Sequence, residues 1–114
     1  MKEPVIHVIS GKATSKQIKE MAEFYGGYIK VAVDIKKRIV AGGGEWHADC
    51  ERVLLEQGSN QKEVWGAGFT PASQAVDFFS LINVRPKQHN PEQNILSQEI
   101  RDTVEAIIRD KLEI

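Results

Sequence analysis

The sequence predicts an α+β fold, in which an antiparallel, meander-like sheet of four to five strands carries two or three helices packed on one face. Residues 28–35 alternate apolar and polar side chains, which is the period of a half-buried strand. Residues 97–112 repeat apolar side chains with the period of an amphipathic helix. At 114 residues, the chain is expected to form a single domain over residues 1–114.

The first half of the chain contains a strand, a helix and a hairpin in that order. Residues 5–9 form a short apolar run that predicts a strand, and Thr14 has the spacing of a capping box that begins a helix. Glycines at 26 and 27 are expected to end this helix. Residues 38–42 are expected to return along 28–35 as a hairpin, although its turn has no Asn-Gly pair.

Three glycines at 42–44 interrupt the pattern and indicate a bend, a bulge or a close approach of backbone to another group. Residues 45–57 fit two interpretations. A helix gives an apolar stripe that includes Trp46 and Cys50, whereas a strand places Glu45 and His47 on one face. Length and composition favour the helix.

The second half is expected to form two strands, at residues 64–69 and 76–84, before the last helix. The second of these is rich in aromatic and branched residues and ends at Pro86. A polar loop over residues 87–94 follows, and Ser97 is a suitable cap for the final helix.

Composition excludes several classes of protein. Fifteen Lys and Arg against sixteen Asp and Glu exclude a polycation that binds nucleic acid through bulk charge. The charges are segregated, with eight basic and four acidic residues in 1–38, two and six in 39–82, and five and six in 83–114. A single cysteine excludes a disulfide scaffold, and no signal or membrane-spanning segment is evident, so a cytoplasmic location is expected.

The first candidate site lies in the acidic middle of the chain, directly after the glycines. Glu45, His47 and Asp49 combine carboxylates with an imidazole, which is suited to divalent metal binding or to acid–base catalysis. No complete zinc or nucleotide-binding signature is present. A plain alternative is that the carboxylates only complement the positive end of a helix dipole.

The second candidate site lies near the end of the last predicted strand. Asn83, Arg85 and Gln88 can all donate hydrogen bonds, as a site for an anion or a nucleic acid requires. The alternative is an ordinary solvated strand end. The metal, the cofactors and the substrate are left open by the sequence, and a homo-oligomer is compatible with it.

The segments Gly43-Gly44-Glu45-Trp46-His47-Ala48-Asp49 and Ile82-Asn83-Val84-Arg85-Pro86 resemble the signature segments of a family of small bacterial proteins that is defined only as a domain of unknown function. The resemblance covers roughly residues 16–112. It implies a stand-alone domain and places both candidate sites in the family's signature segments, but it implies no activity.

Three functions are therefore compared. The favoured hypothesis is a non-catalytic module that binds protein or nucleic acid, although the net charge does not support nucleic acid. The alternative is a small metal-dependent or acid–base hydrolase or nuclease-like enzyme, and the third is an oligomer with the motifs at its interface. Convergence of Glu45, His47 and Asp49 with Asn83 and Arg85 in one pocket would favour the enzyme or another ligand-binding site.

Overall fold

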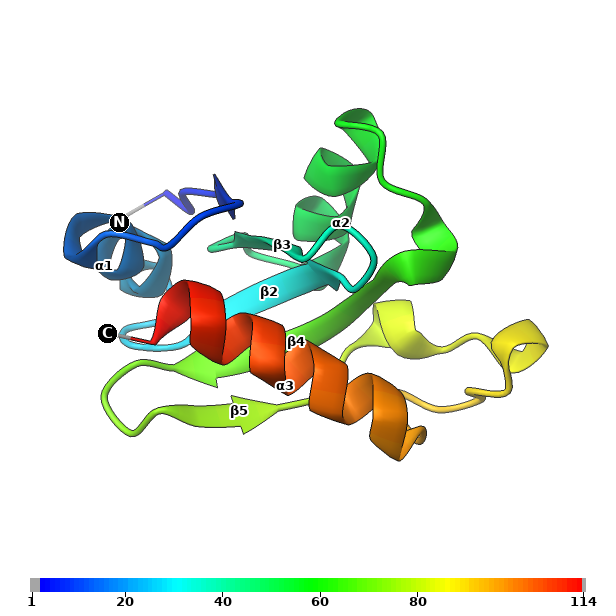
Figure 1. The fold of residues 1–114 in the computed structure, drawn as a ribbon. Coiled ribbons are helices and arrows are strands. Elements are labelled where there is room, and N and C mark those ends of the chain that lie inside the picture. The colour runs from blue at the N-terminus through cyan, green and yellow to red at the C-terminus, as the bar shows by residue number, and fades with distance from the viewer. Residues whose placement is uncertain (1–2, 114) are drawn as a thin grey trace.

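The computed structural model describes residues 3–113, which form a five-stranded antiparallel sheet and three α-helices (Figure 1). The strands are β1 (His7–Ile9), β2 (Ile29–Asp34), β3 (Ile39–Gly42), β4 (Val64–Thr70) and β5 (Ala75–Asp77). The helices are α1 (Ser15–Glu23), α2 (His47–Glu56) and α3 (Gln98–Leu112), and the 3₁₀ turns are η1 (Gln61–Glu63), η2 (Leu81–Asn83) and η3 (Pro86–Gln88). The predicted α+β class and its antiparallel sheet are confirmed.

Strand β2 lies at the centre of the sheet, whose order is β1-β3-β2-β4-β5. Its alternation assigns the two faces: Ile29, Val31 and Val33 belong to the larger core cluster, whereas Ala32 belongs to a second, smaller cluster. The polar face predicted for residues 28–35 is therefore also covered in part, and β2 is buried on both sides along much of its length.

The helices cover both faces of the sheet rather than one, which corrects the predicted layering. Helices α1 and α3 pack their apolar stripes into the larger cluster. Helix α2 lies on the opposite face, where Cys50 and Leu54 pack against Ala32 and Ala41 (Figure 1). The small alanines of β2 and β3 let this helix approach the sheet closely. Within residues 3–113, every helix falls short of the length and apolar character that a membrane span requires.

The local signals for the helices predicted their positions well. Thr14 makes the expected capping box with Gln17, with both hydrogen bonds present. The ambiguous segment 45–57 is a helix, α2, as composition favoured. Trp46, however, is the N-cap residue of α2 and is 59% exposed, so it does not belong to the buried stripe.

The strand predicted over residues 76–84 is wrong for most of its length. Strand β5 ends at Asp77, and the chain then crosses the α2 side of β4 as a loop that contains η2 and η3. The aromatic and branched residues that indicated a strand include Phe79, Leu81 and Val84, all of which are exposed. They therefore form part of a surface instead of a core.

Two glycines of β4 allow this loop to cross the sheet. A Cβ atom on Gly66 would meet the side chain of Ser80, and one on Gly68 would meet the hydroxyl of Tyr28 and the carboxylate of Asp77. Tyr28 donates a hydrogen bond of 2.7 Å to Asp77 directly over Gly68, which ties β2 to β5 across β4.

Replacing Gly68 by alanine is expected to lower the free energy of unfolding by about 2 kcal/mol, because the added methyl group must displace the Tyr28–Asp77 pair. Urea denaturation measures the loss. Gly11→Ala is the matched control, since its Cβ would meet nothing within 4 Å. Adding Tyr28→Phe to Gly68→Ala should recover part of the loss, and equal stability of the two alanine variants would contradict the packing argument.

Candidate functional site

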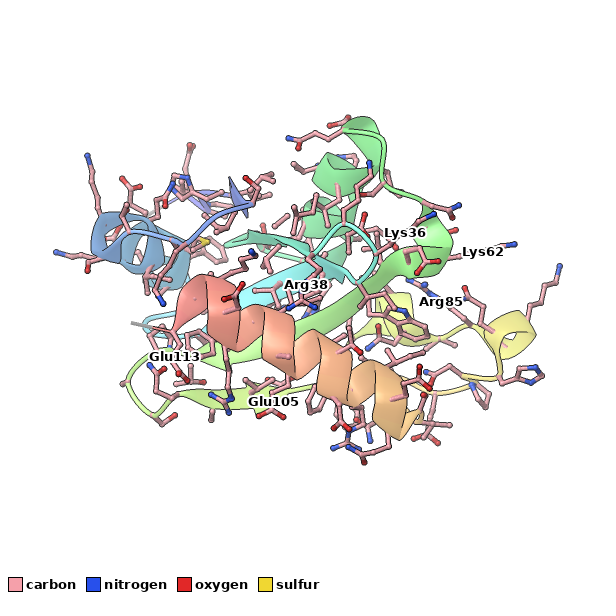
Figure 2. The ribbon with its side chains drawn as sticks, in the orientation of Figure 1. Lys36, Arg38, Lys62, Arg85, Glu105 and Glu113 are labelled. Carbon is pink, nitrogen blue, oxygen red and sulfur yellow. The ribbon has the colours of Figure 1, made fainter. Side chains whose placement is uncertain are left out.

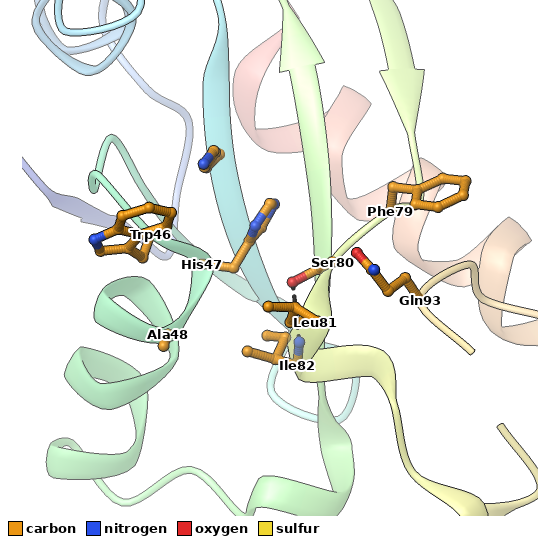
Figure 3. A pocket seen from close by; sticks show the side chains of 9 residues that line it. Trp46, His47, Ala48, Phe79, Ser80, Leu81, Ile82 and Gln93 are labelled. Atoms are coloured by element: carbon orange, nitrogen blue, oxygen red, sulfur yellow. Dashed lines mark hydrogen bonds between the residues drawn. The ribbon is translucent and has the colours of Figure 1, made fainter. Parts of the chain in front are cut away.

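A pocket of about 230 Å³ lies between the start of α2 and the segment Phe79–Ile82 (Figure 3). Trp46, His47 and Ala48 line it from α2, and Lys30 contributes from β2. The opposite wall consists of residues 79–82 together with Gln93. The rim is apolar and exposed, because Trp46 and Phe79 are each more than half exposed.

A second pocket of about 550 Å³ lies on the other side of η2. Its lining includes Val84, Arg85 and residues of η3. The two pockets share Leu81 and Ile82. Leu81 is 74% exposed, so η2 forms an apolar ridge between the two pockets.

His47 is the candidate catalytic residue that lines the first pocket. Its Nε2 atom lies 2.9 Å from the carbonyl oxygen of Ala67. A carbonyl oxygen can only accept, so Nε2 carries the proton and Nδ1 is unprotonated in the neutral ring. Burial lowers the pKa of His47 below the ordinary value of 6.5 and the Lys30 ammonium lowers it further, whereas the Ala67 carbonyl and Asp77 oppose the change.

We expect the NMR titration of His47 to have its midpoint below 6.5, and the Nε2-H tautomer to be present at pH 7. Because the pKa is lowered by folding, the unfolded chain binds the proton more readily. The contribution of His47 to stability is therefore complete above pH 6.5 and is lost as the pH falls towards the folded pKa. A midpoint at or above that of the urea-unfolded protein, or an Nδ1-H tautomer, would contradict this assignment.

Glu45 and Asp49 do not line either pocket. Asp49 accepts a hydrogen bond of 3.2 Å from the backbone N–H of Trp46 and lies 3.4 Å from Arg52, so it caps the first turn of α2. Glu45 contributes its backbone carbonyl, which accepts from the hydroxyl of Tyr25 and the ammonium of Lys30. The closeness of Glu45 and Asp49 to His47 in the sequence is therefore explained by their positions at the start of α2.

Arg85 holds the loop against β4 and η1 instead of presenting its charge to a ligand (Figure 2). Its guanidinium donates to the carbonyl oxygens of Ile82, Gln61 and Val64, and it lies 3.5 Å from Glu51. The same group stacks over the ring of Trp65, 4.6 Å from its centroid. The Arg85 side chain is 9% exposed, and its donors are directed at the protein itself.

Asn83 is completely buried and also has a structural role. Its side chain accepts from the N–H of Gly66 at 2.8 Å and donates to the carbonyl oxygen of Gly66 at 2.9 Å. The amide thereby takes the place of a neighbouring strand at the point where β5 no longer pairs with β4. Gln88 donates to the carbonyl oxygen of Lys62, which attaches η3 to η1.

Asn90 is an organising residue that the candidate set did not include. Its side-chain nitrogen donates to the carbonyl oxygens of Asn83, Glu92 and Asn94, and its side-chain oxygen accepts from the N–H of Leu96. Its backbone also pairs with that of Arg85 as an isolated bridge. Asparagine in a loop without periodicity is the one sequence signal for this role.

The predicted residues therefore do not converge in one pocket. His47 lines the first pocket, Arg85 and Gln88 line the second, and Asn83 is buried between β4 and the loop. Among residues 3–113, no group of three or more His, Cys, Asp or Glu side chains is placed to hold a metal ion. Burial raises the pKa of the Cys50 thiol to about 11, which makes it a poor nucleophile.

The residues that do form the first pocket were mostly not singled out from the sequence. Lys30 is the central example, since it is the one cation on the α2 side of β2. Its position in the strand, directly before the three apolar residues 31–33, was a usable signal. Phe79 and Leu81 could not be recognised as surface residues, because their segment has the composition of a buried strand.

Comparison with known proteins places the chain in a family. No curated protein and no solved structure matches it. A family model described as "Protein of unknown function (DUF5674)" matches residues 7–111. The match includes all of the strands and helices except the last residue of α3. The chain therefore belongs to the DUF5674 family.

Proposed function

We propose that the protein is a non-catalytic module of the cytoplasm that binds another protein through the surface around η2. The observation that carries this proposal concerns exposed apolar side chains. Seven large apolar side chains are exposed among residues 3–113, and four of them line the two adjoining pockets. These four are Trp46, Phe79, Leu81 and Val84. Exposed apolar residues scattered singly need no explanation, whereas residues gathered around one ridge are typical of a docking surface.

The chemistry of this surface favours a protein partner over a nucleic acid. Trp46 and Phe79 could stack on bases, but Val84 and Leu81, which lines both pockets, offer no aromatic face. The chain has a net charge of −1, and the guanidinium of Arg85 donates to backbone carbonyl oxygens of the protein itself. A nucleic-acid site needs several cations free to contact phosphates. An apolar ridge with a pocket on each side instead suits the alternating side chains of an extended peptide.

The hydrolase alternative is less well supported by the geometry. It requires Glu45 and Asp49 to act together with His47 on one substrate. Only His47 lines the first pocket, and Asp49 is engaged at the cap of α2. The exposed apolar surface therefore supports protein binding more strongly than the titratable groups support hydrolysis.

Selection from a random peptide library tests the proposal. Peptides are selected on the wild-type protein and counter-selected on the double variant Phe79→Ala, Leu81→Ala. Both side chains are more than half exposed, so their removal should leave the fold intact. Leu96→Ala is the matched control, because Leu96 is exposed but lines neither pocket.

The expected result is a set of peptides that bind the wild type and the control but lose at least about ten-fold in affinity on the double variant. Peptides that bind all three proteins equally would contradict the proposal. So would an RNA gel shift that weakens with salt and requires the same surface. A concentration-dependent dimer that is lost in the double variant would identify the partner as a second copy of this chain.

A further inference from the structure

The wall of the first pocket contains a positive charge that has no acidic partner within residues 3–113. Lys30 projects from β2 on the side that faces α2, since its neighbours Ile29 and Val31 point into the opposite core. Its ammonium donates to the carbonyl oxygen of Glu45 at 3.1 Å. Among the described residues, no carboxylate lies within the 4.0 Å that an ion pair requires of Lys30.

Two aromatic rings fix this ammonium in place without neutralising it. Nζ of Lys30 lies 4.7 Å from the centroid of the Tyr25 ring and 5.0 Å from that of the Trp46 ring. Contacts with ring faces hold a cation in position and leave its net charge unchanged. An ammonium has three donors, and its hydrogen bond to the carbonyl oxygen of Glu45 leaves donors for a ligand.

The acids on neighbouring elements have other partners. Asp77 accepts from the hydroxyl of Tyr28 and from the N–H of Phe79. Asp49 accepts from the N–H of Trp46 and pairs with Arg52. His47 is neutral at pH 7 and adds no cation, although it lines the pocket beside Lys30. Neither carboxylate lines the pocket, so Lys30 is the one Lys, Arg, Asp or Glu residue in its lining.

The size of the pocket limits what can accompany a negative group. Its 230 Å³ is smaller than the roughly 300–1,000 Å³ of typical small-molecule sites. A nucleotide or another large cofactor would not be enclosed by it. One side chain fits, and the exposed Phe79 and Leu81 at the rim offer apolar contact to the residue next to it.

We infer that this pocket binds an acidic side chain of the protein partner, with its carboxylate on Lys30 and an adjacent bulky apolar residue on Phe79 and Leu81. The inference rests on the proposed function, because it names the part of a partner that the docking surface accepts. The recognised element is thus a short segment in which aspartate or glutamate is next to an apolar residue. Charge complementarity of this kind sets specificity, and its strength falls with salt.

A pair of small probes that differ only in charge tests the inference. These are 3-phenylpropionate and 3-phenylpropanamide, titrated into the ¹⁵N-labelled protein while the amide signals of residues 46–48 and 79–82 are followed. The carboxylate is expected to bind about ten-fold more tightly than the amide at low salt. In Lys30→Met this preference should disappear, and in Lys30→Arg it should persist. Lys62→Met is the matched control, since Lys62 is exposed and lines neither pocket.

Several results would overturn the inference while leaving the proposed function intact. These are equal binding of the two probes to the wild type, no shift of the pocket signals by the carboxylate, or a preference that survives in Lys30→Met.

Peptides from the selection provide a second test of the inference. Replacing their acidic residue by its amide should weaken binding to the wild type but not to Lys30→Met, and selected peptides that discriminate the surface but contain no acidic residue would also overturn it. Failure of the selection itself would instead contradict the proposed function.

Discussion

Asn83→Asp is expected to lower the free energy of unfolding by several kcal/mol, because the change reverses the polarity of a completely buried group. The Asn83 side-chain nitrogen donates to the carbonyl oxygens of Gly66, Phe78 and Gln93, at distances of 2.9–3.1 Å. An aspartate would place an oxygen, and at neutral pH a negative charge, against these three acceptors. A buried group left without partners costs about 1–3 kcal/mol, and a charged group costs more. Since a small domain is stable by only about 5–15 kcal/mol, this loss should be a large fraction of the total stability of the protein.

Urea denaturation measures the loss, and the same amide-to-acid substitution at an exposed site separates the cost of burial from any general effect of replacing asparagine by aspartate. Asn60→Asp is the control, because Asn60 is exposed and uses only its side-chain oxygen, which accepts from the N–H of Lys62. Aspartate keeps that bond, so the stability should change by less than about 0.5 kcal/mol. Asn83→Ala should fall between the two. If Asn83→Asp is as stable as Asn60→Asp, the amide of Asn83 does not hold the loop on β4.

The role of Asn83 also explains why the strand predicted over residues 76–84 is wrong beyond Asp77. A strand was predicted because the segment is rich in aromatic and branched residues. In the structure, the Asn83 side chain supplies both hydrogen bonds that a longer β5 would have made with Gly66. The backbone is then free to leave the sheet after Asp77, so Phe79 and Leu81 become exposed. Strand propensity is a local property, so it does not detect the hydrogen bonds between Asn83 and Gly66, which lie seventeen residues apart in the sequence.

Other parts of the fold could be predicted because the signal lies within one element. The capping box at Thr14 and the stripe of α3 depend on neighbouring turns of the same helix. Placement of α2 on the opposite face from α3 depends on the small side chains of Ala32 and Ala41, which periodicity does not record. For the same reason the candidate site could be predicted only at His47. The pocket requires Lys30, Trp46 and Phe79 to meet from three separate segments.

The second large effect is expected for Arg85→Met, which should lower the free energy of unfolding by about 3–5 kcal/mol. The guanidinium of Arg85 holds three carbonyl oxygens of the loop, η1 and β4, and it faces Glu51 at 3.5 Å. The two charged side chains are only 9% and 13% exposed. Methionine preserves much of the packing over Trp65 but leaves the carboxylate of Glu51 without its counter-charge.

The pH dependence of this variant distinguishes the lost charge from lost packing. Burial raises the pKa of Glu51 in the folded protein, and Arg85 opposes that rise. In Arg85→Met the opposing charge is gone, so the folded pKa should rise further above the unfolded value near 4.5. A group whose pKa is raised by folding binds its proton more tightly in the folded state. The variant should therefore regain stability as the pH falls through that raised pKa towards 4.5, unlike a packing defect.

A double-mutant cycle with Glu51→Gln completes the test, because glutamine removes the buried charge and keeps the shape of the side chain. If the unpaired carboxylate is the main cost, Arg85→Met, Glu51→Gln should be more stable at pH 7 than Arg85→Met alone, and its stability should lose the extra pH dependence. If the three carbonyl bonds are the main cost, the second substitution will recover little. Arg85→Lys distinguishes the charge from the carbonyl hydrogen bonds, since lysine retains a positive charge for Glu51 but cannot reach three carbonyl oxygens at once. An Arg85→Lys variant as stable as the wild type would show that charge alone anchors the loop, and that the planar guanidinium over Trp65 is not required.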